Sequence, residues 1–216
     1  MLGSPRAERS RRDVLASDGA EGQDARMFSR KKDRVSVAIH LNARLRPLDR
    51  GERFEDPLDA HLRARIPGTS VVGGGTLVSA AGEPLSCDIE IAWAGSPEQA
   101  VSTLEPLLER LGTPRGSSVT VGAGSAVPLG RTEGLGIYLN GTDLPQEVYQ
   151  QSDVNELIEQ LLAALDDEGD LFSYWEGPTE TALYLYGTSA DAMRALVSPV
   201  LTTHALAERS RVSRLN

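Results

Sequence analysis

Ile39-His-Leu-Asn42 recurs almost unchanged as Ile137-Tyr-Leu-Asn140. In both tetrapeptides apolar and polar side chains alternate, which is the period of a β-strand with one buried face. Each is followed by a long polar stretch and then by an aspartate, Asp56 or Asp153, that begins a helical pattern. We therefore expect one structural unit to occur twice along the chain.

The order of the remaining elements supports this duplication. A strand, a helix, two strands, a helix and a strand are predicted in the first copy, and the same order returns in the second. Ser96 is followed by Gln99, and Asp153 by Glu156, a spacing typical of a capping box. The expected strands cover residues 35–42, 71–79, 85–93, 117–121, 135–140, 171–175 and 181–186, with a short strand around Val212, and the helices begin at Asp56, Ser96, Asp153 and Ser189.

Two prolines lie at matching positions inside these expected helices. Pro106 follows Ser96 at the distance at which Pro199 follows Ser189. A proline in a helix interior costs about 3 kcal/mol, so a matched pair indicates common descent. The element order predicts an α+β fold, a tandem duplication of a ferredoxin-like βαββαβ unit with antiparallel sheets and helices on one face. The predicted domains are a disordered leader at 1–34, a first repeat at 35–124 and a second at 132–216.

Charge is unevenly distributed along the chain. Residues 1–34 hold nine Lys and Arg against six acids, which leaves 13 basic and 25 acidic residues in 35–216 and a net charge of −12 there. Nucleic-acid affinity depends on Lys and Arg that neutralise phosphates, so no nucleic-acid partner is expected. The sequence leaves open whether Met27 is the true start.

The chain carries no sign of a membrane, secretory or metal-binding protein. No apolar run reaches the roughly 18 residues that a membrane helix needs, and the start lacks the apolar stretch of a signal peptide. The single cysteine, Cys87, provides neither a disulfide nor a metal-binding cluster and is expected in the core. We therefore expect a cytoplasmic protein without membrane contact, metal or cofactor.

Strand alternation predicts which side chains lie on the sheet face that the helices leave open. In the first repeat, apolar residues at 87, 89, 91 and 93 indicate the helix side, so Asp88 and Glu90 point outward, together with His40 and Asn42. His40, Asp88 and Glu90 are the only candidate catalytic residues, as a general acid–base group or a weak metal site. The alternative is that they are solvated polar residues or an inter-repeat contact.

The open face of the second repeat is expected to be aromatic. Leu183 and Leu185 take the helix side, which sends Tyr184 and Tyr186 outward, and Tyr138 follows by the same alternation. Such a patch is typical of an interface, because tyrosine combines apolar area with hydrogen bonding. It is either an external binding surface or the buried seam between the repeats. Further candidate binding residues on the adjacent strand are Tyr174 and Trp175.

Residues 44–56 are expected to form a long charged loop, and long loops in compact domains are often functional. Its counterpart, residues 141–152, carries Asp143 and Glu147 and no arginine. The two loops could pair electrostatically, or the first could bind an acidic ligand. The candidate binding residues in this segment are Arg44, Arg46, Arg50 and Arg53.

Several stretches resemble an uncharacterised family of small bacterial proteins with a duplicated ferredoxin-like unit. They are the run from Leu41 to Pro57, Gly73-Gly-Gly-Thr76, Cys87-Asp-Ile-Glu90 and Tyr174-Trp-Glu-Gly-Pro-Thr-Glu-Thr-Ala-Leu183. The resemblance covers roughly residues 35–216 and implies a compact, stand-alone bacterial protein. It implies no activity.

These observations favour a non-catalytic binding protein that acts through the open sheet face or an inter-repeat groove. By analogy of fold and charge, it could capture a partner protein as immunity proteins do. The first alternative is a small-molecule-binding regulatory protein, which predicts a ligand-sized cavity between the repeats. The second is a small enzyme that uses His40, Asp88 and Glu90. Since no nucleophile elbow, phosphate-binding loop or His-rich motif occurs, an enzyme is the less favoured interpretation.

Overall fold

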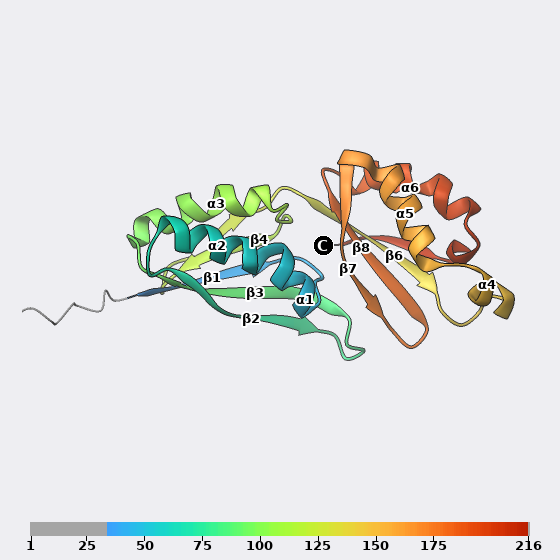
Figure 1. Ribbon diagram of the computed structural model, residues 1–216, viewed down its shortest axis with the longest axis horizontal. Helices are drawn as coiled ribbons and strands as arrows, with labels where there is room; N and C mark the ends of the chain where they lie inside the picture. The colour runs from blue at the N-terminus through green and yellow to red at the C-terminus, as the bar shows by residue number, and fades with distance from the viewer. Residues whose placement is uncertain (1–33, 216) are drawn as a thin grey trace, which may run out of the picture. The chain divides into compact units, whose positions relative to one another are not determined.

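The computed structural model describes residues 34–215, which contain two antiparallel β-sheets (Figure 1). The first sheet has five strands in the order β2-β3-β1-β4-β5, and the second has four in the order β7-β8-β6-β9. In each sheet the first and third strands of a repeat are central neighbours. The fold is therefore α+β, with two ferredoxin-like units in tandem, as the sequence predicts.

Each repeat places its longer helices on one face of its own sheet (Figure 1). The first repeat comprises β1 (Val35–Leu41), α1 (Pro47–Arg50), the π-helical turn η1 (Gly51–Glu55), α2 (Asp56–Arg65), β2 (Ser70–Val78), β3 (Pro84–Trp93), the 3₁₀ turn η2 (Pro97–Gln99), α3 (Ala100–Arg110), β4 (Ser117–Val121) and β5 (Val127–Leu129). The second comprises β6 (Glu133–Asn140), α4 (Gln146–Gln151), α5 (Val154–Leu165), the 3₁₀ turn η3 (Asp166–Glu168), β7 (Gly169–Glu176), β8 (Glu180–Gly187), α6 (Ala190–Thr203), the 3₁₀ turn η4 (Ala205–Ala207) and β9 (Arg211–Leu215). The short edge strand β5 was not predicted.

The repeats share irregular features as well as regular ones. The β2–β3 register shifts between Val71 and Gly73, and the β7–β8 register shifts between Leu171 and Ser173. Each shift is a bulge or a similar irregularity at the same place in its repeat, and such features are conserved within a family. The internal prolines of α3 and α6 also occur as predicted. These matched irregularities support a duplication.

The expectation of a long loop at residues 44–56 is wrong. α1 begins with Pro47, and η1 and α2 continue it to Arg65. Pro57 lacks an N–H, and in a regular α-helix its ring would clash with the carbonyl four residues earlier. The π-helical turn directly before it changes that spacing, so Pro57 lies inside the helix rather than at its start. The counterpart segment 141–152 likewise contains a helix, α4.

The predicted helix caps differ in outcome. Asp153 accepts a hydrogen bond from the Asn155 amide, and Ser189 accepts one from the Ala192 amide. Ser96 makes no such bond, because its hydroxyl donates to the Glu98 carboxylate instead. The capping box predicted at Ser96 is therefore wrong, and α3 begins with a 3₁₀ turn.

The predicted disordered leader and Met27 lie outside the described residues, apart from Arg34. No helix within residues 34–215 has the length and apolar character needed to span a membrane.

Candidate functional site

The tyrosines of the second sheet form the seam between the repeats. Tyr138, Tyr184 and Tyr186 are at most 4% exposed and belong to the hydrophobic cluster of the first repeat, with Phe54 among its members. Phe172 links the two sides, because its ring lies 6.3 Å from that of Phe54 and 4.7 Å from that of Tyr186. The alternation that places these tyrosines opposite the helices is correct, but the alternative of an exposed platform is wrong.

A partly buried ionic cluster, Glu83 with Arg44, Tyr138 and Tyr184, closes the seam at the tip of the β2–β3 hairpin. Glu83 Oε1 accepts hydrogen bonds from the hydroxyls of Tyr138 at 2.8 Å and Tyr184 at 3.0 Å. The Arg44 guanidinium also donates to Glu83, and the Arg44 amide donates to the Tyr186 hydroxyl at 2.8 Å. Burial, reinforced by the Glu83 carboxylate, raises the pKa of Tyr138 and of Tyr184 above the ordinary value of 10.0.

The other three arginines of residues 44–56 are also paired with carboxylates. Arg46 forms two hydrogen bonds to Asp49, at 2.7 and 2.9 Å, and lies 3.5 Å above the Tyr174 ring. Arg50 donates to Glu55 at 2.6 Å and to Thr76. The fourth arginine, Arg53, pairs with Asp170 of β7 at 2.6 Å. Pairing with the acids of residues 141–152, one of the two alternatives, therefore does not occur.

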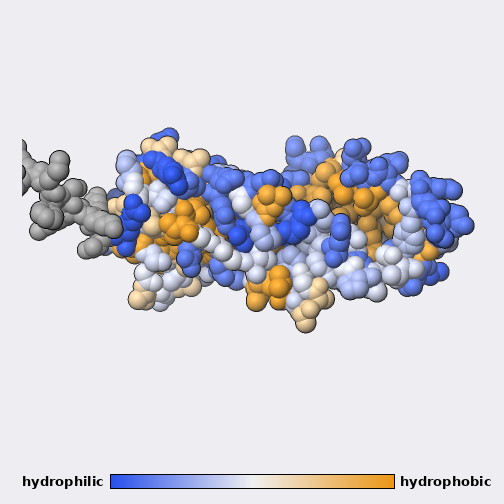
Figure 2. All heavy atoms as spheres, turned by 60° about the horizontal axis from the view of Figure 1, so that its bottom comes forward, coloured by the Kyte–Doolittle hydropathy of each residue, from blue (hydrophilic) through white to orange (hydrophobic). Residues whose placement is uncertain are grey.

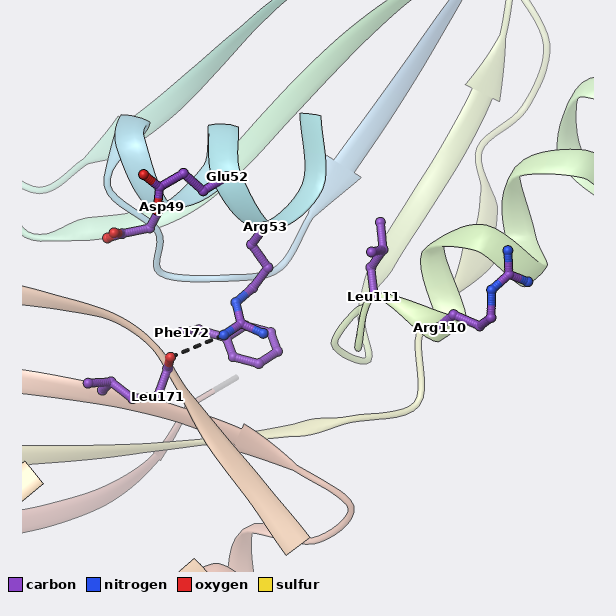
Figure 3. Close-up of a pocket in the computed structure, with 7 residues that line it drawn as sticks. All are labelled: Asp49, Glu52, Arg53, Arg110, Leu111, Leu171 and Phe172. Atoms are coloured by element: carbon purple, nitrogen blue, oxygen red, sulfur yellow. Dashed lines mark hydrogen bonds between the residues drawn. The ribbon is translucent and has the colours of Figure 1, made fainter. Parts of the chain in front are cut away.

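Arg53 also forms part of a cleft that both repeats line. One hollow, of about 510 Å³, is lined by side chains from α1, η1, the end of α3 and β7 (Figure 3). A second hollow, of about 530 Å³, shares Arg53, Arg110, Leu111 and Phe172 with the first and extends along η3 to Thr188. We call the two together the inter-repeat cleft. These hollows are open to solvent and have the volume that small-molecule binding predicts between the repeats.

One wall of the cleft presents a stacked pair. The Arg53 guanidinium lies 3.8 Å above the Phe172 ring, and it donates to the Leu171 carbonyl at 3.2 Å (Figure 3). Arg110, at the end of α3, donates to the Pro106 carbonyl of its own helix. Its guanidinium makes no ion pair with any carboxylate of the described residues.

The charged side chains of the lining are mainly acidic. Two arginines face six carboxylates, a formal charge of −4. Burial opposes the ionisation of one of them, Asp49, but hydrogen bonds from Arg46 and Ser173 outweigh it and lower the pKa of Asp49. The six are Asp49, Glu52, Asp166, Asp167, Glu168 and Asp170.

A separate, more apolar groove of about 410 Å³ brings together Arg46, Tyr174 and Trp175, three of the predicted binding residues. Val78 and Pro84 of the β2–β3 hairpin line it as well. Figure 2 shows that apolar side chains reach the surface in separate patches among hydrophilic ones. Arg46 is already held by Asp49, so its charge is compensated in this groove.

Of the three predicted acid–base candidates, only His40 and Asp88 are in contact with each other. His40 Nδ1 lies 2.9 Å from Asp88 Oδ1, and the two residues are direct partners across β1 and β3. Glu90 pairs with Ala38, one position along the same face, and makes no hydrogen bond to His40. Within residues 34–215 no three His, Cys, Asp or Glu side chains are arranged to hold a metal ion, so the weak metal site predicted there is not formed.

The sequence-based predictions missed Glu83 at the seam and Arg110 in the inter-repeat cleft. Glu83 follows a turn glycine and carries the pattern of a solvated hairpin tip. Arg110 is the last residue of α3, where a basic side chain is ordinary because it interacts favourably with the helix dipole. Neither position carries a sequence signal of its own, since each becomes important only where the two repeats meet.

No protein-family model matches the chain, and no curated protein matches it, so the resemblance to a bacterial family stays a prediction. Among solved structures, the chain is similar to a proposed glycine cleavage system transcriptional repressor, with 12% identity, coverage of 84% of this chain and 95% of that one, and a TM-score of 0.28. It is also similar to a proposed monooxygenase from Fusobacterium nucleatum, with 10% identity, 86% and 93% coverage and a TM-score of 0.29. A third is the regulatory subunit of aspartate kinase from Thermus flavus, with 13% identity, 78% and 94% coverage and a TM-score of 0.25. At these values the likenesses carry no argument about a ligand or an activity.

Proposed function

We propose that this chain is a non-catalytic binding protein that holds a small polar molecule in the inter-repeat cleft. The observation that carries this proposal is the lining: both repeats supply side chains to two adjoining hollows of about 510 and 530 Å³. Hollows of roughly 300–1,000 Å³ are the size that small molecules occupy in proteins. A ligand there contacts both repeats and stabilises their junction.

The chemistry of the walls supports a polar ligand. The Arg53 guanidinium, stacked on the buried Phe172 ring, offers one flat surface, and Leu111 is an apolar residue of the same lining. Arg110 is available to an acceptor group. The carboxylates of Glu52, Asp166 and Asp167, which form no ion pair within residues 34–215, are available to donors. Charges of both signs favour a ligand that carries hydrogen-bond donors and acceptors over a hydrocarbon.

Thermal-shift screening of the full chain against polar metabolites tests this proposal. A ligand at 100 times its Kd adds about 2.7 kcal/mol of stability, which corresponds to a Tm rise of roughly 5–10 °C for a chain of this size. We expect the rise to be largely lost in Arg110→Ala and retained in Arg194→Ala. Arg194 is a matched control, because it also lies on an exposed helix face and donates to a backbone carbonyl, that of Val212.

Two results would contradict the proposal. One is a screen in which no polar compound raises the Tm. The other is a shift of equal size in wild type and Arg110→Ala, since such a ligand binds elsewhere.

The structure offers less support for immunity-type protein capture through the tyrosine face. Tyr184 and Tyr186 are buried under the first repeat and cannot contact a partner while the seam is closed. We therefore place ligand binding in the cleft ahead of protein capture.

A further inference from the structure

The two sheets have four edge strands, and three of them carry features that hinder pairing with a further strand. β5 is only three residues long and has Pro128 at its centre. β9 carries Arg211 and Arg214 within five residues. In β7 the Leu171 carbonyl already accepts a hydrogen bond from Arg53. Short length, proline, charge and coverage are the means by which proteins protect sheet edges.

The fourth edge strand, β2, is built differently. It is nine residues long and uncharged, and it forms the outer edge of the first sheet (Figure 1). At one end the Val71 amide donates to the Asp59 carboxylate at 2.9 Å. Within residues 34–215, the stretch left open to pairing is therefore 72–78. We call this stretch the free edge.

The free edge is also apolar. It carries three large apolar side chains that are exposed, Val72 at 59%, Leu77 at 60% and Val78 at 50%. Leu77 is the direct partner of Ser86 on β3, so it projects from the open face of the first sheet. A long, uncharged and apolar edge is suited to pair with another strand, because burial of these side chains adds to the backbone hydrogen bonds.

Two of the three glycines in this strand are not required by the chain itself. A Cβ at Gly74 would lie 2.5 Å from Glu55 Oε1, so packing explains that glycine. A Cβ at Gly75 would meet no heavy atom within 4 Å, and a Cβ at Gly73 would make only an ordinary contact with Glu90, at 3.6 Å. Neither Gly73 nor Gly75 has a positive φ. Because glycine weakens a strand interior, its presence there often marks the close approach of another backbone.

We infer that β2 pairs antiparallel with β2 of a second copy of this chain, so that the two first sheets become one continuous sheet. A two-fold axis perpendicular to the sheet keeps the helices of both copies on the same side. If the axis passes through Gly75 or Thr76, Leu77 of one copy lies directly opposite Gly73 or Gly75 of the other, respectively. Leu77 then occupies space that a larger residue would fill, and the contact occurs twice, because a two-fold interface is self-complementary.

A second copy fits this edge better than an unrelated strand. Leu77 and the bare glycines lie on the same strand, at the spacing that antiparallel self-pairing brings opposite each other. Residues 35–216 carry a net charge of −12, so two copies repel each other over much of their surface, and β2 lets them meet along an uncharged strand.

The dimer is expected to be reversible. A strand of nine residues is about 30 Å long, and one strand pair buries less than the roughly 1,600 Å² of a standard interface. The inference does not depend on ligand binding in the inter-repeat cleft, because no residue of β2 lines that cleft.

Sedimentation velocity of the full chain between about 1 and 200 μM tests the inference, since a micromolar dimer dissociates over that range. We expect the average mass of wild type to rise from monomer towards dimer, and Gly75→Lys and Leu77→Lys to weaken association at least about 10-fold. Each variant places like charges on both sides of the two-fold axis, and the space beside Gly75 admits the new side chain in the monomer. Val127→Lys, on the exposed edge strand β5, is the matched control and is expected to associate as wild type does. Far-ultraviolet circular dichroism verifies that all variants are folded.

Hydrogen exchange gives a second readout. Amides of the free edge are expected to exchange more slowly at high than at low protein concentration, whereas those of β5 stay unchanged. The inference is overturned if wild type stays monomeric over the whole range, or if both lysine variants of β2 associate as strongly as wild type. A dimer in which the amides of the free edge gain no protection also overturns it, because another surface then forms the contact.

Discussion

The substitution Glu83→Ala is expected to weaken the junction of the two repeats more than any change at an exposed acid. Glu83 Oε1 is the acceptor for the hydroxyls of Tyr138 and Tyr184 and for the Arg44 guanidinium. Removing the carboxylate leaves two buried hydroxyls and a half-buried cation without this acceptor. It also detaches the tip of the β2–β3 hairpin from the second sheet.

The size of the effect follows from these contacts. A hydrogen bond to a charged group contributes about 1.5–3 kcal/mol, and stranding a buried donor costs a similar amount. The Glu83 side chain is still 18% exposed, so water replaces part of the lost bonding. We therefore expect a loss of about 2–4 kcal/mol in the free energy of unfolding, or roughly 5–15 °C in Tm for a chain of this length.

Urea unfolding followed by circular dichroism and tryptophan fluorescence measures this loss. Glu83→Gln is expected to lose less, because the amide oxygen still accepts while the charge is removed. Glu90→Ala, an exposed acid on the neighbouring strand β3, is expected to change stability by less than about 0.5 kcal/mol. A Glu83→Ala protein within that same margin of wild type would refute the view that this cluster holds the repeats together.

Two pH dependences follow from the same seam. Burial raises the pKa of Tyr138, Tyr184 and Tyr186 above 10.0, so their contribution to stability is complete below pH 10 and is lost as pH rises beyond it. Tyrosinate absorbance should therefore appear together with loss of circular dichroism. Ionisation of these three tyrosines near pH 10 in an intact fold would contradict their burial. Hydrogen bonds from Arg46 and Ser173 outweigh burial and hold the pKa of Asp49 below 3.8, so its contribution is present above that pH and is lost as pH falls below it. The acid-side decline of the urea midpoint should be shallower in Asp49→Asn, and an unchanged decline would remove Asp49 from its causes.

Local patterns were sufficient to predict the duplicated fold. Alternation along β1, β3, β6 and β8 assigns the inward and outward side chains correctly, because each strand buries one face against its own helices. Matching prolines identified the repeat without knowledge of either sheet. These signals depend on neighbours in sequence or within one repeat.

Features that depend on both repeats could not be predicted in the same way. Residues 44–56 are expected to form a loop, yet α1 and η1 make residues 47–55 helical. Contacts to β7 hold this segment: Arg46 donates its amide to the Ser173 hydroxyl, and Arg53 pairs with Asp170. Alternation places Tyr184 outward correctly but carries no information on what covers it. Burial of that face is decided by the first repeat, far away in sequence.

The sheet faces that the helices leave uncovered differ in burial between the two repeats, and this difference limits where a ligand can bind. Tyr184 of β8 occupies the position that Glu90 occupies in β3. Glu90 pairs with the residue two before His40 on β1, and Tyr184 pairs with the residue two before Tyr138 on β6. In the second repeat that face is aromatic and buried against the first repeat, while in the first it is polar and open. Duplication therefore left one sheet face as structural packing and the other in contact with solvent, and the packing itself created the cleft beside Phe172. The cleft is a consequence of this asymmetry, so ligand binding there can be tested with variants that leave the open face of the first sheet intact.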